Sequence, residues 1–222
     1  MASQTTPAHP AAMETQLEAT SIPRHQPTPA PIVTTSSLMI RPMRLGDGLS
    51  TSLHANDPLI NKYMSLSFPN PYTLSSAEAW IRMNMDLPYQ KNFVICELSA
   101  PDVVIGGIGL TPGADVSVHT AELGFWVGQA YWGKGYMTEV LKAFTIWTFT
   151  EWEQNGQKLT RLWGGVMGGN VASMRCFEKC GYVKEGVWKG HCKKGADVMD
   201  LHFFGSTKLD WERRMKEDLE KN

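Results

Sequence analysis

The stretch of sequence that decides the fold runs from Glu122 to Glu139 and reads Glu-Leu-Gly-Phe-Trp-Val-Gly-Gln-Ala-Tyr-Trp-Gly-Lys-Gly-Tyr-Met-Thr-Glu. It starts as an apolar, aromatic-rich run, which indicates a buried strand. Gly133 and Gly135 follow, and an amphipathic segment begins immediately after them. A strand that leads through a glycine turn into a helix presents free backbone N–H groups, and such groups bind phosphate. We therefore expect an anion-binding turn at these glycines.

The segment after the turn predicts a helix over 135–152, because apolar residues recur on one face of it. They are Met137, Val140, Leu141, Phe144 and Trp147. Further along, the sequence patterns predict a strand at 161–167, a helix at 171–180 ended by Gly181, strands at 182–188 and 198–204 joined by a polar loop, and a frayed charged helix at 209–222.

The segment before the stretch predicts mostly short elements. A Ser-Ser-Ala-Glu sequence at 75–78 matches a capping box and predicts a helix that runs to about Asp86. The other predicted elements are a strand at 38–42, helices at 45–55 and 58–64, a hairpin of strands at 93–98 and 103–110, and a strand at 120–127. This order predicts an α/β (α+β) domain with a mixed, mostly antiparallel central sheet flanked by helices.

Composition excludes several classes of function. The net charge of −1 and the pI of about 6.6 provide no basic field for nucleic acid or for an anionic membrane surface. The four cysteines are too few and too unevenly placed for a disulfide framework. The chain contains neither a signal-like start nor an apolar run long enough to span a membrane. We therefore expect a cytoplasmic protein with no nucleic-acid partner and no membrane partner.

The first 37 residues differ in composition from the rest. They are rich in Pro, Thr and Ser and contain few large apolar residues, so they cannot bury enough surface to offset the entropy of ordering. We predict a disordered tail over 1–37, a folded domain over 38–205 and a charged C-terminal tail or helix over 206–222.

A series of motifs around the central stretch carries a family resemblance. In chain order they are Arg41-Pro42, Ala77-Glu78-Ala79-Trp80, Ile105-Gly106-Gly107-Ile108-Gly109-Leu110, Ala121-Glu122-Leu123-Gly124-Phe125-Trp126, Tyr131-Trp132-Gly133-Lys134-Gly135-Tyr136-Met137-Thr138-Glu139, Asn170-Val171-Ala172-Ser173 and Phe177-Glu178-Lys179-Cys180-Gly181-Tyr182. Together they resemble the GNAT superfamily of N-acetyltransferases, and especially the branch that acetylates the N-terminal alanine or serine of ribosomal proteins. The resemblance covers residues 38–205 and implies a central sheet that is splayed in the middle.

The resemblance implies acetyl-CoA as co-substrate and no metal. In this family the pantetheine arm pairs with a splayed strand, and the matching positions are Phe125, Trp126 and Val127. The pyrophosphate binds at the start of the next helix, which implies a set of contacts from Gly133, Lys134, Gly135, Tyr136, Met137 and Thr138. Asn170 matches a residue that contacts the cofactor arm. Ala130 departs from the Arg or Gln that is common in the family, so the anion would rely on backbone N–H groups and the helix dipole.

Two side chains are predicted to act in catalysis. Acetyl transfer needs a neutral amine, a polarised carbonyl and a proton for the departing thiolate. Glu122 is the predicted base, with a structural ion pair as the alternative, and a backbone N–H near Phe125 is the predicted carbonyl contact. Ser173 lies where this branch often has a hydroxyl near the thiolate, and simple solvation is its alternative. Many relatives have Tyr where Phe177 stands, so Ser173 or water would have to replace that proton donor.

Other polar clusters have simpler interpretations. Cys176 and Cys180 are four residues apart, with His191 and Cys192 further on, and a zinc site is one interpretation of them. Cysteines buried on a helix face explain the first two better, because that helix has to pack. We therefore expect no metal.

The predicted function is acetyl-CoA-dependent N-acetyl transfer to a primary amine, by direct attack in a ternary complex. The alternative is a non-catalytic acyl-CoA-binding or scaffold protein with the same fold, which the departures at Ala130 and Phe177 favour. The acceptor stays open between a protein N-terminus and a small-molecule amine, because the predicted acceptor loops at 64–73 and 190–196 match no motif. A monomer and a homodimer both stay open.

Overall fold

The frame of the molecule is an eight-stranded sheet in the order β1-β2-β3-β4-β5-β8-β10-β9. The computed structural model describes residues 27–220, and in that part of the chain every neighbouring pair of these strands is antiparallel except β5 and β8. The strands are β1 (Val33–Thr34), β2 (Leu38–Arg41), β3 (Asn92–Glu97), β4 (Val104–Pro112), β5 (Thr120–Val127), β8 (Arg161–Met167), β9 (Val183–Lys194) and β10 (Asp197–Thr207). The predicted fold class is confirmed.

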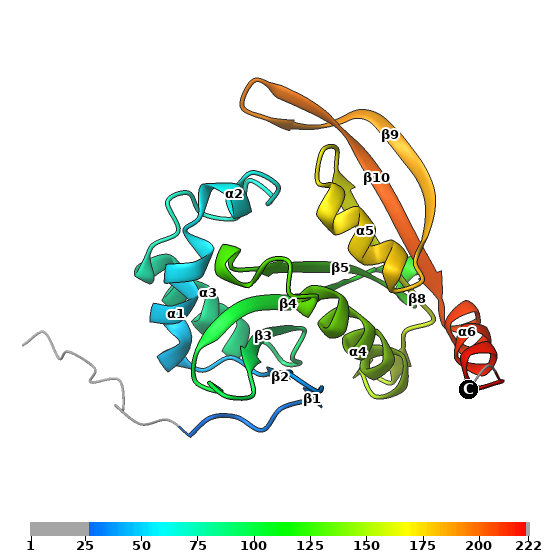
Figure 1. Cartoon of the computed structure of the whole chain (residues 1–222), viewed down its shortest axis with the longest axis horizontal. Coiled ribbons are helices and arrows are strands. Elements are labelled where there is room, and N and C mark those ends of the chain that lie inside the picture. The colour runs from blue at the N-terminus through cyan, green and yellow to red at the C-terminus, as the bar shows by residue number, and fades with distance from the viewer. Residues whose placement is uncertain (1–26, 221–222) are drawn as a thin grey trace, which may run out of the picture.

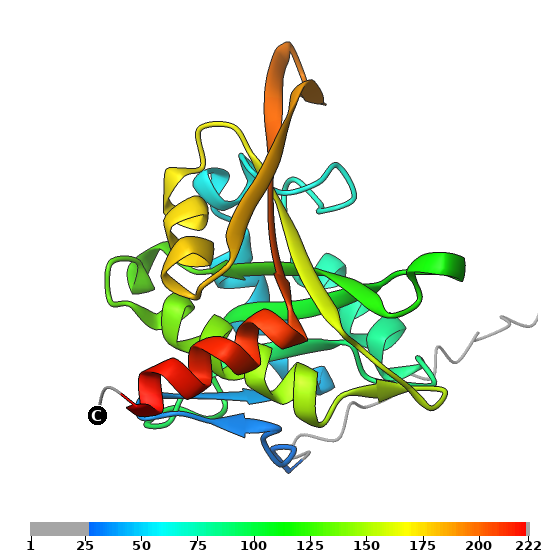
Figure 2. The same cartoon turned by 90° about the vertical axis from the view of Figure 1, so that its right-hand side faces the viewer.

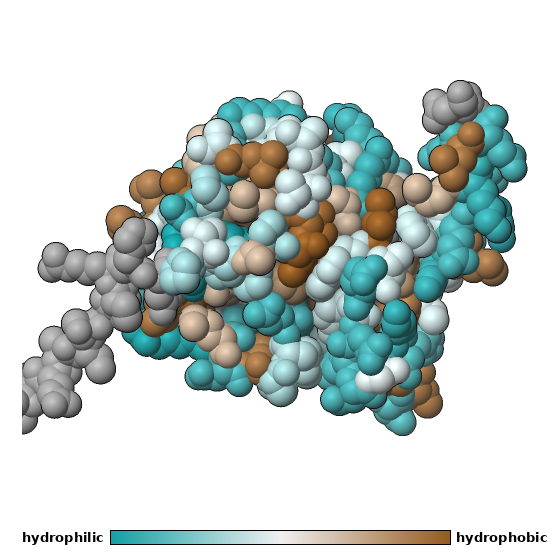
Figure 3. Space-filling model, turned by 90° about the horizontal axis from the view of Figure 1, so that it is seen from below, coloured by the Kyte–Doolittle hydropathy of each residue, from teal (hydrophilic) through white to brown (hydrophobic). Residues whose placement is uncertain are grey.

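Helices lie on both faces of this sheet (Figure 1). They are α1 (Gly48–Ala55), α2 (Pro58–Asn61), α3 (Leu74–Met85), α4 (Tyr136–Thr150), α5 (Val171–Lys179) and α6 (Lys208–Glu220). The main core joins one sheet face to α4 and α5, and a smaller cluster joins the other face to α1 and α3. None of the helices in residues 27–220 combines the length and apolar character needed to cross a membrane. Seen from below, hydrophobic areas of the surface are separated by hydrophilic and neutral residues (Figure 3).

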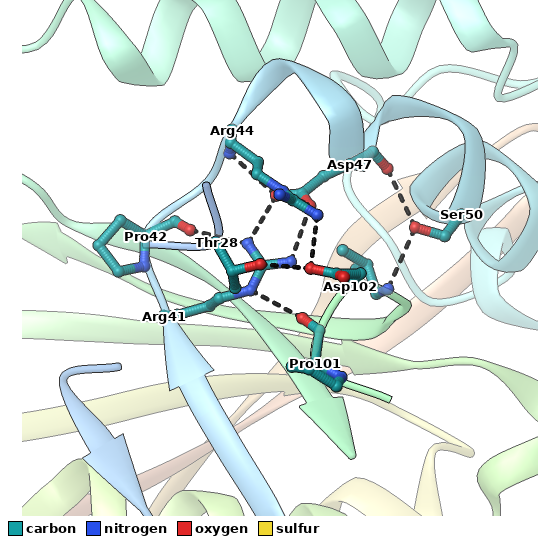
Figure 4. Close-up of polar contacts among 9 residues, drawn as sticks. Thr28, Arg41, Pro42, Arg44, Asp47, Ser50, Pro101 and Asp102 are labelled. Carbon is teal, nitrogen blue, oxygen red and sulfur yellow. Dashed lines mark hydrogen bonds and ion pairs between the residues drawn. The ribbon is translucent and has the colours of Figure 1, made fainter. Parts of the chain in front are cut away.

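A buried ion pair fixes α1 to the sheet (Figure 4). Arg41, fully buried at the end of β2, donates two hydrogen bonds to the Asp47 carboxylate, at 2.9 Å and 2.7 Å. Its Nε donates to the carbonyl of Pro101 at 3.1 Å. At the surface, Arg44 pairs with Asp102 at 2.7 Å. Because a buried guanidinium needs all its donors satisfied, this network holds the first turn of α1 in place.

The N-terminal boundary of the folded part needs a correction. Val33 and Thr34 form β1 and pair with β2, and Ile32 and Val33 pack against the main core. The prediction of disorder through residue 37 is therefore wrong for this segment, because its two apolar side chains bury against the sheet edge. Residues 1–26 of the predicted tail lie outside the described residues.

The predicted polar loop between the last two strands is also wrong. Most of the segment is strand, and β9 and β10 form one long hairpin with Gly195 at φ +62° in its turn. The hairpin projects beyond the body of the sheet (Figure 2). Because most of the outer side chains are exposed, no hydrophobic alternation marks these residues as strand.

Two smaller differences concern local signals. Thr73, not Ser75, is the N-cap of α3, and its hydroxyl accepts a hydrogen bond from the N–H of Ser76. A short hairpin of β6 (Glu153–Gln154) and β7 (Gln157–Lys158) was not predicted. Its turn is Asn155-Gly156, and both residues have positive φ, at 52° and 75°. An Asn-Gly pair of this kind is the usual sequence of a two-residue hairpin turn, and it was the missed signal.

Candidate active site

The site is built where β5 and β8 separate. The two strands pair in parallel at Thr120, Ala121 and Glu122, and no pairing continues beyond Glu122 in the described chain. On its other side, β5 stays paired with β4 as far as Val127. The part of β5 from 123 to 127 therefore has one edge without a strand partner.

The register shows which backbone groups reach that free edge. The N–H of Gly128 donates to the carbonyl of Ile105 at 2.8 Å, so this pair is of the hydrogen-bonded kind. In an antiparallel ladder, hydrogen-bonded and non-hydrogen-bonded pairs alternate. The residues of β5 whose N–H and C=O groups point away from β4 are therefore Leu123, Phe125 and Val127.

Trp126 and Val127, which were also predicted to bind the cofactor, have fewer free backbone groups than Phe125. The backbone of Trp126 faces β4, where it pairs with Gly107, so only its side chain is available. The carbonyl of Val127 accepts a hydrogen bond from the Trp132 indole at 2.8 Å, which leaves its N–H on the free edge. The main-chain groups available for an extended ligand are thus centred on Phe125. A free strand edge of this kind binds extended chains with amide groups.

The free edge borders a cleft of about 1800 Å³. The side chains of β5 divide this cleft between the two faces of the sheet. Trp126 packs with the small cluster of α1 and α3. Phe125 packs with the main core, and its ring centroid lies 5.3 Å from that of Phe177 on α5. Because side chains alternate along a strand, Glu122 and Gly124 face the same side as Trp126.

The glycine turn leads into α4 as predicted. Gly133 and Gly135 have φ values of +76° and +79°, which residues with side chains rarely adopt. Gly135 is the N-cap of α4, and the first N–H that bonds within the helix is that of Glu139, to the Gly135 carbonyl at 3.1 Å. The three preceding N–H groups have no acceptor within the helix, and they belong to residues that line the cleft: Tyr136, Met137 and Thr138.

Lys134 lies close to this turn but does not line the cleft. Its Nζ is 5.0 Å from the ring centre of Tyr131 and 5.5 Å from that of Tyr136. The Tyr136 hydroxyl donates to the Glu97 carboxylate at 2.6 Å. The ammonium group therefore adds positive charge beside the turn, in a cation–π arrangement that holds it there.

Glu122 lies at the point where the strands part. It is half-buried, and burial raises the pKa of its carboxyl, while a hydrogen bond from the backbone N–H of Gly165 opposes that shift. Within residues 27–220 it forms no ion pair, which argues against the structural alternative. A carboxylate with a raised pKa beside a cleft is a candidate general base.

Asn170 and Ser173 lie at the start of α5, and both line the cleft. Asn170 is the N-cap of α5, and its Oδ1 accepts a hydrogen bond from the N–H of Ser173 at 3.2 Å. Capping fixes the amide side chain, so helix capping by itself already accounts for an Asn at this position.

Phe177 is part of the core. It is 2% exposed, stacks on Phe204 with centroids 5.6 Å apart, and fills the space above Gly164. The nearby phenol of Tyr182 is buried and shares a hydrogen bond with Thr145 at 2.7 Å. Neither ring therefore offers a proton to the cleft.

A contact across the cleft mouth was not predicted. Lys194, at the tip of the β9–β10 hairpin, donates hydrogen bonds to the carbonyl of Asn61 and, at 2.8 Å, to that of Met64. These carbonyls lie at the end of α2 and just after it, so the hairpin and the α2 segment form a roof over one side of the cleft. No motif could have shown this, because the partners are more than a hundred residues apart and one partner is backbone.

The cysteines of α5 pack against the start of α4. The Thr138 hydroxyl lies 3.9 Å from Cys176 Sγ, and Cys180 Sγ lies 3.5 Å from the Thr138 carbonyl. Among the residues that the structure describes, no group of three His, Cys, Asp or Glu side chains could hold a metal ion.

Comparison with known proteins decides the family. A sequence profile of the acetyltransferase (GNAT) domain matches residues 37–183. The chain belongs to the GNAT acetyltransferase family. The uncharacterized N-acetyltransferase p20 of Bacillus licheniformis is 28% identical over 180 residues, which cover 80% of this chain and 96% of p20.

Solved structures share this GNAT fold. RimL, an α-N-protein acetyltransferase of ribosomal L7/L12 solved with coenzyme A, has a TM-score of 0.67 at 15% identity, covering 82% of this chain and 99% of RimL. The microcin C7 self-immunity acetyltransferase MccE, solved with acetyl-CoA and AMP, has a TM-score of 0.65 at 19% identity, covering 82% and 97%. The protein is thus a GNAT N-acetyltransferase, and these two structural neighbours were solved with CoA or acetyl-CoA.

Proposed function

We propose that the protein transfers the acetyl group of acetyl-CoA directly to a primary amine, within a ternary complex. The observation that carries this proposal is the free edge of β5, which has Glu122 at one end and the glycine turn of α4 at the other. An extended amide-containing arm fits such an edge, and a pyrophosphate fits such a turn.

The cofactor would bind along these elements in one direction. The C=O of Phe125 and the N–H of Val127 pair with the pantetheine amides, and Trp126, whose backbone faces β4, adjoins the arm with its side chain on the acceptor face. The pyrophosphate accepts hydrogen bonds from the turn and the first turn of α4, with Lys134 adding charge nearby. Asn170 contacts the arm from the side of α5. The turn residues in this set are Gly133, Gly135, Tyr136, Met137 and Thr138.

The chemical step then needs only groups at the point where the strands separate. The amine nitrogen attacks the thioester carbon while the N–H of Phe125 stabilises the developing oxyanion. The C–N bond forms, the C–S bond breaks, and the amine proton passes to Glu122 directly or through water. The CoA thiolate takes a proton from Ser173 or from water. No covalent enzyme intermediate is required.

The acceptor is a protein N-terminus or a small-molecule amine. RimL acts on the α-amine of a ribosomal protein, while MccE is a self-immunity acetyltransferase, so fold alone leaves both classes open. We place the reaction in the cytoplasm, with the enzyme as a monomer or homodimer, and without a metal or a nucleic-acid partner.

The test combines calorimetry with acetyl-CoA and a thiol-release assay over a panel of amines and peptides. We expect tight binding of acetyl-CoA and release of CoA with at least one class of amine. Binding without turnover on any amine would support the acyl-CoA-binding alternative instead. Absence of acetyl-CoA binding would refute both.

A further inference from the structure

We infer that the acceptor is a primary amine with a single positive charge, attached to an apolar or aromatic group. This inference rests on the proposed function, because it concerns the acceptor side of the same cleft. Its basis is an open floor beside Glu122, the apolar walls around that floor, and the charges that line the cleft.

The floor is the surface of β5 over Gly124. No atom lies within 4 Å of the position that a Cβ would take at Gly124, and the residue lines the cleft. Its neighbours on the same face are Glu122 and Trp126, whose Cα atoms are about 13 Å apart at ordinary strand rise. On β4, the Trp126 indole covers Gly107 and the Asn92 side chain covers Gly109. The open strip therefore runs along β5, from the carboxylate to the indole.

The walls of this strip are apolar and aromatic. Phe68 and Tyr72 lie with their ring centroids 4.6 Å apart, and both pack with Trp126 in the small cluster. Other apolar residues that line the cleft on this side are Met43, Met64, Trp80 and Leu201. An organic group lying over Gly124 would contact carbon on several sides, and burial of its apolar area would favour binding.

The charges give the second part of the inference. In the described chain, the charged side chains that line the cleft are Lys62, Glu122, Arg175 and Lys179. Arg175 and Lys179 belong to α5, on the cofactor side. Glu122 is thus the one carboxylate there, so a polyamine or aminoglycoside would leave most of its ammonium groups without a partner. An unpaired charge in a partly buried site is disfavoured, because no counter-charge offsets its loss of hydration.

Two kinds of acceptor carry such an amine and fit the open strip: an arylalkyl amine, and a peptide whose first residue is apolar or aromatic. The assay compares phenethylamine, a peptide with N-terminal Phe, the same peptide with N-terminal Asp, and spermidine. We expect kcat/KM for the first two to exceed that for the last two by at least about tenfold, which corresponds to about 1.4 kcal/mol. The preferred member of the first two identifies the source.

The variant that tests the floor is Gly124→Val, and Gly186→Val is its matched control. Both glycines lie in strands, and neither has an atom within 4 Å of its Cβ position, but only Gly124 lines the cleft. Both variants should therefore fold. We expect Gly124→Val to lower kcat/KM for the preferred acceptor at least about tenfold, with CoA affinity retained, and Gly186→Val to change neither quantity.

Two results would overturn the inference while leaving the proposed function intact. They are a preference for spermidine or the Asp peptide, and unchanged acceptor kinetics in Gly124→Val. If no amine of the full panel is turned over by the wild-type enzyme, the proposed function fails first, and this inference fails with it.

Discussion

The proposed pyrophosphate-binding site at the glycine turn of α4 can be tested by one substitution and a closely matched control. Gly135 and Gly156 have φ values of +79° and +75°, and neither has an atom within 4 Å of its Cβ position. A side chain at either position meets the same backbone strain, about 1–2 kcal/mol, without a clash. For a domain of this size, that loss lowers Tm by about 2–8 °C. The variants Gly135→Glu and Gly156→Glu should therefore unfold at similar temperatures.

Their affinities for CoA should differ greatly. Gly156 lies in the β6–β7 turn, away from the cleft, whereas Gly135 lines the cleft as the N-cap of α4. A carboxylate about 4 Å from one phosphate charge costs about 4 kcal/mol at an effective dielectric constant of 20. This energy corresponds to a roughly thousandfold increase in Kd. Gly156→Glu should bind CoA as the wild type does.

The measurements are calorimetry with CoA and thermal unfolding followed by circular dichroism. Added salt screens the repulsion, so the affinity of Gly135→Glu should recover in part at high ionic strength. The new carboxylate also meets the positive end of α4, which offsets about 0.3–1 kcal/mol of the strain. If Gly135→Glu is folded and binds CoA as tightly as Gly156→Glu does, the pyrophosphate does not bind at this turn.

Three further predictions concern Glu122, the buried Arg41–Asp47 pair and the contact of Lys194 with the α2 segment. Because burial raises the pKa of Glu122 and the carboxylate is the active form, wild-type rates should fall as pH falls through that pKa. Glu122→Gln should lower kcat by about 10²–10⁴-fold and remove this acid limb from the pH–rate profile; an unchanged profile would make Glu122 structural. Asp47→Ala leaves the buried Arg41 without its carboxylate partner and should lower the free energy of unfolding in urea by about 3–5 kcal/mol. Asp102→Ala removes an exposed carboxylate and should lower it little. Equal losses in the two variants would contradict the role of the buried pair. Lys194→Met removes the hydrogen bonds to the carbonyls of Asn61 and Met64. It should raise KM for the acceptor and speed amide hydrogen exchange in the segment after α2, with CoA affinity unchanged. Unaltered exchange would show that Lys194 does not hold this segment over the cleft.

The sequence contained enough to predict the central part of the site. The apolar run ending at Val127, the two glycines and the 3.6-residue pattern of α4 are local signals, and the observed strand and helix bounds agree with them. Positive φ at Gly133 and Gly135 agrees with the prediction of a turn there. These features depend on neighbours in the sequence, so one chain suffices to predict them.

Features that depend on distant partners could not be predicted in this way. The outer part of β9 and β10 is mostly polar and has no apolar alternation, so only their mutual pairing shows that they are strands. The roof joins Lys194 to backbone carbonyls at the end of α2 and just after it. Trp126 was assigned to the cofactor edge as a position that matches the family's splayed strand, whereas the register turns its backbone to β4 and its indole to the face where the acceptor is proposed to lie. Strand register is a tertiary property, and a shift of one residue exchanges the two faces.

The alternation of β5 suits the two binding roles proposed for this strand. Phe125 directs its N–H and C=O groups, and Val127 its N–H, to the free edge, where the cofactor arm is proposed to pair. Glu122 and Trp126 direct their side chains to the face where the acceptor is proposed to lie. Glu122 is also the last residue of β5 that pairs with both neighbouring strands, so its carboxylate stands where the edge and the face meet. In the proposed complex, the acetyl group at the end of the arm and the amine at the end of the open strip meet at that point, so the register of the sheet would fix the position of the proposed base, Glu122.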